Sequence, residues 1–236
     1  PRLRKTVAEA VECMHKHHID AIAIDDEPDY AELEQWLDHN APDMPIFEIA
    51  PDADSQLAVL REVQLLLNQL HTDDSNDDYN ESYYFKLARE RWVKRLLCGL
   101  APNREYVLKQ QRMYRCKEDP QQPCVYARIC MPEGDAFIAS RWHYGSERLG
   151  VALQNFFGEA FDHLNLHLAV VTPEEIRLIL CPVRGDTQHP VSLSRAKAYI
   201  EETIEQIENY LGLTLTVTEL SLRKGLTDFA GEAPKD

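Results

Sequence analysis

The chain has 236 residues, a formal net charge of −15 and 44% hydrophobic residues, which suits one or two folded domains. This acidity argues against a surface that grips nucleic acid, because binding phosphates requires clustered lysine and arginine side chains. No apolar stretch reaches the roughly 18–20 residues of a membrane span, and the N-terminal segment lacks the apolar core of a signal peptide. We therefore expect a cytoplasmic protein without a membrane partner, whose six cysteines are reduced.

The first 71 residues predict an α/β lobe. Apolar residues recur three or four positions apart in three segments and form compact runs in two others. The helical segments are 7–18, 29–38 and 52–70, and the strand-like segments are 19–24 and 45–50. Because helices and strands alternate with short connections, the two strands are expected to pair in a parallel sheet.

An acidic linker and two connector helices are predicted over residues 72–123. Residues 71–82 are polar and acidic, which is typical of a domain boundary. A helix follows over 81–100 and should stop near Gly99, because glycine commonly ends helices; a second helix is expected over 103–114. The first helix carries an apolar stripe that either lines a dimer seam or packs against its own domain: Tyr84, Leu87, Trp92 and Leu96.

Residues 124–229 predict a second module, followed by a tail over 230–236. Its strands are expected at 124–131, 166–172, 175–183 and 213–220, and its helices at 145–164 and 192–212. The last helix should be capped by Ser192 or Ser194 and end at Gly212. The order β-α-β-β-α-β indicates an α+β module of the ferredoxin-like kind.

The stretch "IDAIAIDDEPDYAEL", Ile19–Leu33, resembles the strand of a receiver domain that ends in the phosphoacceptor. Open α/β sheets place their sites at the carboxyl ends of the strands. The resemblance implies Asp25 as the phosphoacceptor, with Asp26 and Glu27 as acidic neighbours and Mg²⁺ as the cofactor. In a competing register the same segment is the first strand and its acidic pair holds Mg²⁺. We favour the first register, because no second apolar strand ending in Asp follows before the linker.

In that register the lobe is a partial, degenerate flavodoxin-like receiver. The strand ending near Ile49 is not followed by the Thr or Ser with which receivers sense the phosphoryl group, and no Lys occurs between Asp26 and Lys86. Phosphoryl transfer needs such charges together. We therefore expect Asp25 and Asp26 to be ordinary acidic residues at a strand end, and no cofactor.

The segment "LARERWVKRLLCGLAPNREYVLKQQRMYRC" followed by "CVYARICM" is similar to the region after the receiver in AraC-type two-component response regulators. The resemblance implies the regulatory part of a longer transcription regulator, without its helix-turn-helix domain. It also implies a homodimer that reaches DNA only through segments outside this chain. Its input would come from a sensor kinase or a small ligand, and dimer geometry would relay it without enzymatic chemistry.

The second module also resembles the nucleotide-cyclase-like fold of diguanylate cyclases, whose hairpin carries a Gly-Gly-acidic-acidic-Phe motif. The corresponding turn here lies in Thr172–Leu180 and is degenerate, because Pro173 replaces a glycine and no glycine lets the backbone approach a phosphate. Glu174 and Glu175 remain. A nucleotide-binding or cyclase-related enzyme module is the alternative interpretation, but we expect a plain hairpin and no catalytic residue.

The histidines offer a possible metal interpretation. His15, His17 and His18 lie near the end of the first helix, and His163 and His167 are four residues apart near a helix-to-strand boundary. A zinc site needs three or four converging ligands. Because neither group is expected to converge, we predict no metal site.

Overall fold

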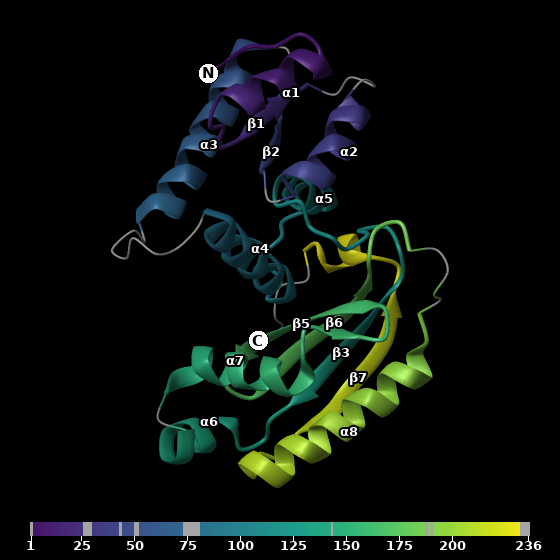
Figure 1. The fold of residues 1–236 in the computed structure, drawn as a ribbon. Coiled ribbons are helices and arrows are strands. Elements are labelled where there is room, and N and C mark those ends of the chain that lie inside the picture. The colour runs from purple at the N-terminus through teal and green to yellow at the C-terminus, as the bar shows by residue number, and fades with distance from the viewer. Residues whose placement is uncertain are drawn as a thin grey trace. The chain divides into compact units, whose positions relative to one another are not determined.

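The computed structural model describes residues 2–25, 30–42, 44–49, 52–72, 81–142, 144–186, 189 and 191–231. Over these residues the chain is mixed α/β, with a two-stranded parallel sheet and a five-stranded antiparallel sheet (Figure 1). It divides into two compact units. Unit 1 is Pro1–Arg89 with Lys109–Cys116, and unit 2 is Glu90–Leu108 with Lys117–Asp236. The region predicted as connector therefore contributes residues to both units.

Unit 1 contains the parallel sheet that the first 71 residues predict. Strand β1 (Ile22–Ile24) pairs in parallel with β2 (Ile46–Glu48), with Ile22 opposite Ile46. Three helices accompany this sheet: α1 (Val7–Lys16), α2 (Tyr30–Asn40) and α3 (Ala53–Thr72). Thr6 is the N-cap of α1, and its side-chain oxygen accepts a hydrogen bond from the backbone N–H of Glu9.

Two small apolar clusters hold unit 1 together on opposite faces of its sheet. Ile24 and Ile46 pack with Leu33 and Leu37 of α2 in one cluster. Phe47, the neighbour of Ile46 in β2, belongs to another cluster with Val59 of α3 and Met113. Successive strand residues point to opposite faces, so the alternation along β2 assigns α2 and α3 to different sides of the sheet.

Two connector helices, α4 (Glu81–Leu97) and α5 (Arg104–Met113), lie close to their predicted bounds. Gly99 adopts a φ of 75°, a left-handed conformation that ends α4 as glycine usually does. In unit 2, Trp92 of α4 meets Tyr106 of α5 edge to face, with 5.8 Å between ring centroids. No helix among the described residues has both the length and the apolar character needed to cross a membrane.

Unit 2 is built on an antiparallel sheet with the strand order β4-β5-β6-β3-β7. Its strands are β3 (Cys124–Cys130), β4 (Ala160–Phe161), β5 (Leu164–Thr172), β6 (Glu175–Pro182) and β7 (Thr216–Arg223). The helical segments are α6 (Gly134–Phe137), the π-helix η1 (Ile138–Trp142), α7 (Gly145–Phe157), α8 (Leu193–Leu211) and the 3-10 helix η2 (Leu226–Phe229). All six cysteines of the chain are unbridged thiols.

Helices α7 and α8 cover one face of this sheet (Figure 1). The inward side chains alternate along the strands, and they pack with apolar residues of both helices. The contributing residues include Val125, Ala127, Ile129, Leu178 and Leu180 from the strands, Leu149, Leu153 and Phe157 from α7, and Ala196, Ile200 and Ile207 from α8. Strand β6 is buried from Ile176 to Pro182 without alternation, so its other face is covered as well.

Two predicted boundaries in unit 2 are wrong. The helix expected over 145–164 ends at Phe157, because Gly158 takes a φ of 68° and Ala160–Phe161 then forms β4. The Phe161 ring stacks on Tyr199 with 4.1 Å between centroids, a contact available only once α8 is in place. The last strand spans 216–223 instead of 213–220. The predicted cap and stop of α8, Ser192 and Gly212, are both confirmed.

Replacing Gly134 by alanine should destabilise unit 2, because the added Cβ would lie 1.7 Å from the carbonyl oxygen of Pro173. Relieving such an overlap in a packed region costs about 1–3 kcal/mol. Urea unfolding followed by circular dichroism should give a lower midpoint for Gly134→Ala.

Gly150→Ala is the matched control, since its Cβ would meet Val170 Cγ2 at an ordinary 3.5 Å. This change in helix α7 should leave stability equal or raise it by up to about 1 kcal/mol. An unchanged midpoint for Gly134→Ala would contradict the packing described here.

Candidate functional site

The proposed phosphoacceptor Asp25 directly follows β1, at the carboxyl end of the strand, and its side chain is exposed. The backbone N–H of Ile49 donates to the carbonyl oxygen of Ile24 at 2.7 Å, so the pairing of the two strands extends to this edge. Asp26 and Glu27 lie outside the described residues. The receiver-type role of this acidic group therefore stays a prediction.

An arginine from α5 occupies the carboxyl end of the neighbouring strand β2. Arg112 donates from Nη1 to Glu48, the last residue of β2, at 2.5 Å, and from Nε to Glu34 of α2 at 2.7 Å. Burial alone would lower the pKa of Arg112, but the two hydrogen-bonded carboxylates raise it. The arginine is thus held as a cation that joins α5 to the sheet and to α2.

The hairpin predicted to be a degenerate cyclase-type motif is the turn between β5 and β6, and its two glutamates have different surroundings. Glu174 is exposed, and its backbone N–H donates to the side-chain oxygen of Thr172 at 3.3 Å. Its carbonyl oxygen accepts from the backbone N–H of Met131 at 2.7 Å. The turn is thereby fastened to the segment after β3, where Gly134 leaves room for the Pro173 carbonyl.

Glu175 is held by two arginines on the sheet face opposite α7 and α8. Arg177 donates from Nε to Oε1 at 2.7 Å, and Arg128 donates from Nε to Oε2 at 2.8 Å. Burial would raise the pKa of Glu175, but the hydrogen bonds and charges of these arginines lower it. The carboxylate is ionised and already has two cationic partners, which makes it a poor ligand for a metal ion.

Arg177 extends this network to the end of α4. Its Nη1 donates to the carbonyl oxygen of Leu97, the last residue of the helix, at 2.9 Å. The carbonyl groups at a helix C-terminus lack intrahelical donors and attract cations. One buried guanidinium, 7% exposed as a residue, therefore binds both the hairpin glutamate and the connector helix.

The apolar stripe of α4 is described only in part. Trp92 and Leu96 are 4% and 1% exposed, so these side chains are buried and present almost no surface to a partner. Tyr84 and Leu87 belong to α4, but their side chains lie outside what the structure describes. A dimer seam along this helix stays a prediction for its first half.

A buried carboxylate that the sequence analysis missed lies on the same sheet face. Segment 117–119 runs beside the end of β6, with Glu118 in an isolated bridge to Val183. Glu118 Oε1 is 2.8 Å from Nε2 of His167 and accepts from Nδ2 of Asn165 at 2.9 Å. Its Oε2 is buried and has no hydrogen-bond partner among the described residues. Nothing local in the sequence links Glu118 with His167.

The surroundings of Glu118 keep it ionised. Burial would raise its pKa, but the hydrogen bond and charge of His167, a backbone N–H and the Asn165 amide lower it to about 2. Asn165 and His167 both lie on β5 two residues apart, so they point to the same face of the sheet. This triplet fastens segment 117–119 to the sheet.

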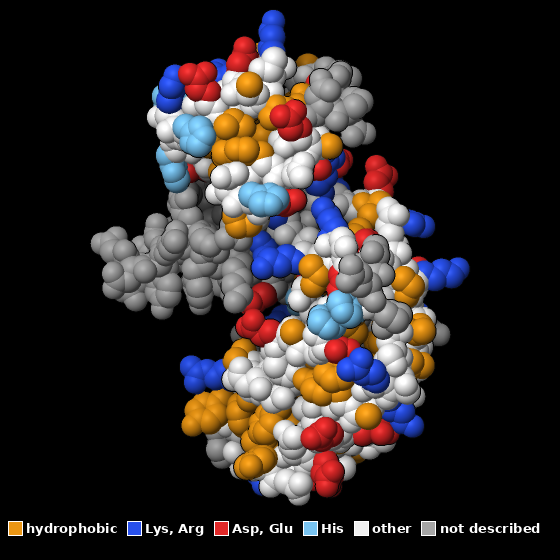
Figure 2. Space-filling model, turned by 45° about the vertical axis from the view of Figure 1, so that its right-hand side comes forward, with side chains coloured by type: hydrophobic (Ala, Val, Ile, Leu, Met, Phe, Trp, Pro, Cys, Tyr) orange, Lys and Arg blue, Asp and Glu red, His pale blue; other side chains and the backbone are white. Residues whose placement is uncertain are grey.

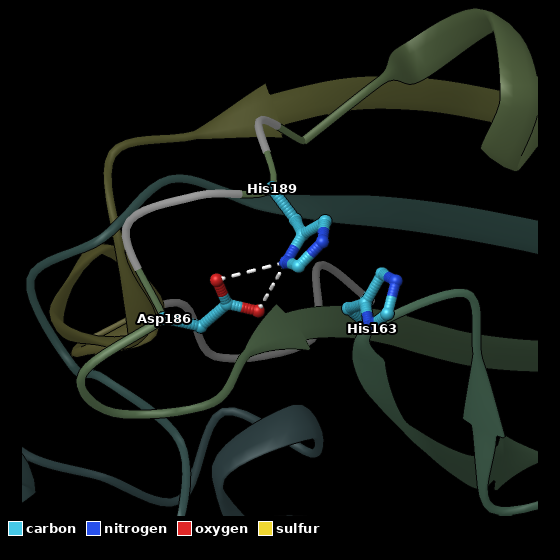
Figure 3. A group of neighbouring side chains, drawn as sticks. All are labelled: His163, Asp186 and His189. Atoms are coloured by element: carbon cyan, nitrogen blue, oxygen red, sulfur yellow. Dashed lines mark hydrogen bonds and ion pairs between the residues drawn. The ribbon is translucent and has the colours of Figure 1, made fainter.

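His163 belongs to a different group from His167. It lies in the turn between β4 and β5, where its ring stacks on His189 with 3.7 Å between centroids (Figure 3). His189 Nδ1 is 2.9 Å and 3.0 Å from the two carboxylate oxygens of Asp186. One ligand atom from each of His163, Asp186 and His189 lies within 4.8 Å of the others, which is the arrangement of a candidate metal site.

The N-terminal histidines belong to unit 1 and do not form such a group. His15 lies in the last turn of α1 and its ring meets Trp36 edge to face, with 5.7 Å between centroids. His17 is the C-cap residue of α1, and His18 Nε2 lies 3.2 Å from Asp20. Figure 2 shows that several histidine side chains are exposed on the face that it presents.

An open groove of about 650 Å³ lies between α1 and α2 of unit 1. Val7, Val11 and Trp36 provide apolar surface, and His15 and His39 are among its polar residues. Apolar walls with a few polar groups are typical of small-molecule sites. The groove is therefore a candidate small-molecule site in this unit.

No family model matches the chain, and no curated protein matches it in sequence.

Replacing Glu118 by glutamine should weaken unit 2 at neutral pH and flatten its response to acid. Because the folded pKa of about 2 is below the ordinary 4.5, the ionised carboxylate stabilises the fold above pH 4.5. That contribution, on the order of 3 kcal/mol, is lost as the pH falls from 4.5 to 2. Urea unfolding at several pH values in this window should therefore give a free energy of unfolding that changes less steeply with pH for Glu118→Gln than for the wild type.

Glu174→Gln is the matched control, because this exposed glutamate should leave the acid response of the wild type unchanged. Equal slopes for Glu118→Gln and the wild type would show that another group controls the acid response.

Proposed function

We propose that this chain is a non-enzymatic regulatory module of a signal-transduction protein. It is similar to the region that precedes the helix-turn-helix domain in AraC-type response regulators. Unit 1 would be a partial receiver-like, flavodoxin-like lobe and unit 2 a ferredoxin-like or cyclase-like module. The observation that carries the proposal is the double contact of Arg177 with the hairpin Glu175 and the end of α4.

The arrangement of the long strands supports the assignment of unit 2. Their spatial order is β5-β6-β3-β7, so the second and third strands form a hairpin beside the first, and the fourth lies on the other side of the first. All neighbouring pairs are antiparallel. A βαββαβ unit folds in this way when its two helical crossovers pack on one face.

The state of the hairpin argues against nucleotide chemistry in unit 2. Binding Mg²⁺ and phosphate requires carboxylates that can face the ion and a backbone that can approach the phosphates. Here Arg128 and Arg177 both donate hydrogen bonds to the Glu175 carboxylate. The Pro173 carbonyl occupies the space beside Gly134. The Glu175 carboxylate thus serves the architecture of the module, and the side chain of Glu174 is exposed.

The same contacts suggest how a conformational state passes through unit 2. A hydrogen bond from a charged donor contributes roughly 1.5–3 kcal/mol. Because a difference of about 1.4 kcal/mol changes an equilibrium tenfold, making or breaking the Arg177–Leu97 bond is enough to shift the population of two α4 arrangements. The hairpin and the helix end would then change together.

The proposal includes partners that this chain would need. It would act as a cytoplasmic homodimer and reach DNA through segments outside the chain. Its input would be a sensor kinase or a small ligand, and the groove between α1 and α2 suits the latter. Metal or nucleotide cofactors have no part in this relay.

The relay is tested by hydrogen exchange in the last turn of α4. Arg177→Met removes both contacts of the guanidinium, so amides of residues 94–98 should exchange about ten times faster or more. Arg128→Gln, which takes one cationic partner from Glu175 and keeps the Leu97 contact, should speed exchange at the hairpin and, by a smaller factor, in the last turn of α4, because the two would change together. This variant therefore still tests the relay if Arg177→Met does not fold.

Arg148→Gln is the matched control. This exposed arginine of α7 lies over the Tyr144 ring, away from the network. Equal exchange in α4 for Arg177→Met and Arg148→Gln would refute the relay. Separately, heating the wild type with nucleoside triphosphates and Mg²⁺ should leave its melting temperature unchanged. A clear rise would favour the nucleotide-binding alternative.

A phosphorylatable receiver is the second candidate, favoured by the exposed position of Asp25 at the carboxyl end of β1. In that case acetyl phosphate with Mg²⁺ should label the wild type, and Asp25→Asn should lose the label. Intact mass spectrometry reads the 80-Da addition, about the mass of one phosphoryl group. Equal labelling of both proteins would exclude Asp25.

A further inference from the structure

Two loops at one edge of unit 2 bring together two imidazoles and a carboxylate. His163 comes from the turn between β4 and β5, and Asp186 and His189 come from the segment between β6 and α8 (Figure 3). We propose that these residues bind a first-row divalent transition-metal ion such as Zn²⁺. The site is separate from the Glu175 network and does not depend on the relay.

The ligand atoms are close to the spacing that a metal ion requires. One atom from each residue lies within 4.8 Å of the other two. In a tetrahedral zinc site with bonds of 2.0–2.1 Å, neighbouring ligands are about 3.3 Å apart. The widest spacing therefore needs to close by up to about 1.5 Å, which rotation of the two exposed histidine side chains can supply without moving the backbone.

The contacts of the two rings place them for metal binding. His189 Nδ1 lies 2.9 Å from Asp186 Oδ2, close to the spacing of two ligands on one ion, so Nδ1 is the nitrogen that would bind together with this carboxylate. Asp162 lies 3.9 Å from Nε2 of His163 and is held by Arg195 at 2.7 Å. A carboxylate beside a metal-binding imidazole orients the ring and raises its basicity as a ligand.

The backbone sets both loops in unusual conformations directly before the ligands. Asp162 precedes His163 with a φ of 58°, and Gly185 precedes Asp186 with a φ of 86°. Left-handed residues are uncommon outside glycine, and Asp is among the few that adopt them readily. Both turns thus direct a ligand side chain toward the same place.

The ligand types select the class of ion. Two nitrogens and one carboxylate suit Zn²⁺, Ni²⁺, Cu²⁺ or Co²⁺, whereas Mg²⁺ and Ca²⁺ prefer oxygen ligands alone. The side chains of His163 and His189 are 53% and 47% exposed and that of Asp186 is 22% exposed. Solvent can therefore complete the coordination, and the ion can enter and leave. The net charge of −15 favours cations near the surface.

A bound ion would tie the β4–β5 turn to the segment that leads into Ser192, the N-cap of α8. Because the unfolded chain lacks this arrangement of ligands, binding would stabilise the folded unit by mass action. The predicted consequence is a melting temperature that depends on zinc concentration.

The experiment is a calorimetric titration of the whole chain with Zn²⁺, repeated with Co²⁺ under an absorption spectrometer. The wild type should bind one equivalent at this site and show visible Co²⁺ bands. His163→Gln with His189→Gln should weaken binding at least about tenfold and abolish the zinc-dependent rise in melting temperature. Asp186→Asn is a milder variant that keeps the proposal testable if the double variant misfolds.

His17→Gln with His18→Gln is the matched control, because His18 also lies near an aspartate, Asp20, but in unit 1. This control should keep the wild-type affinity and spectrum. Long-range ¹⁵N NMR of the histidine rings should show Nδ1 of His189 shifting on zinc addition. The proposal is overturned if the ligand variants bind as the wild type does, or if only the control loses the ion.

Discussion

A buried charge in the middle of the larger sheet constrains the rest of unit 2. Arg177 is 7% exposed and lies on β6, which is covered on both faces. An unpaired charge in such a position costs several kcal/mol, so it must be neutralised and hydrogen-bonded. Glu175 supplies the charge and the Leu97 carbonyl supplies an acceptor. Satisfying this one guanidinium thus links the end of the connector helix to the hairpin glutamate.

The same requirement explains why some acidic residues of unit 2 hold the fold together whereas another is available to bind a metal ion. Glu118 is buried and the side chain of Glu175 is 16% exposed, and the partners of both carboxylates keep their pKa values low. The carboxylate of Asp186, whose side chain is 22% exposed, lies beside two imidazoles that are about half exposed. Enclosure among strong partners favours an architectural role, whereas exposed nitrogen ligands beside a carboxylate leave room for an ion. Environment, more than residue type, separates these roles.

The connector helices are the elements on which the proposed relay would act. Both α4 and α5 contribute residues to the two units, so neither helix is a free spacer. In unit 1, Arg112 binds α2 and β2, and in unit 2, Arg177 binds the end of α4. Each helix is therefore anchored by charge-assisted bonds within a unit, and a change in either anchor acts on a rigid element of secondary structure.

The sequence by itself determined the local elements, because periodicity, caps and glycine stops act over a few residues. It predicted the parallel pairing of β1 with β2, the order of the long strands along the chain, and the limits of α8 at Ser192 and Gly212. Only the tertiary structure decided which distant groups meet. His163 contacts His189, and Glu118 contacts His167, because of the strand register and the paths of the loops, which no local sequence pattern encodes. Gly158 is a local stop for α7, but the β4 residues after it are held by pairing with β5 and by the Phe161–Tyr199 contact, which exist only in the assembled unit.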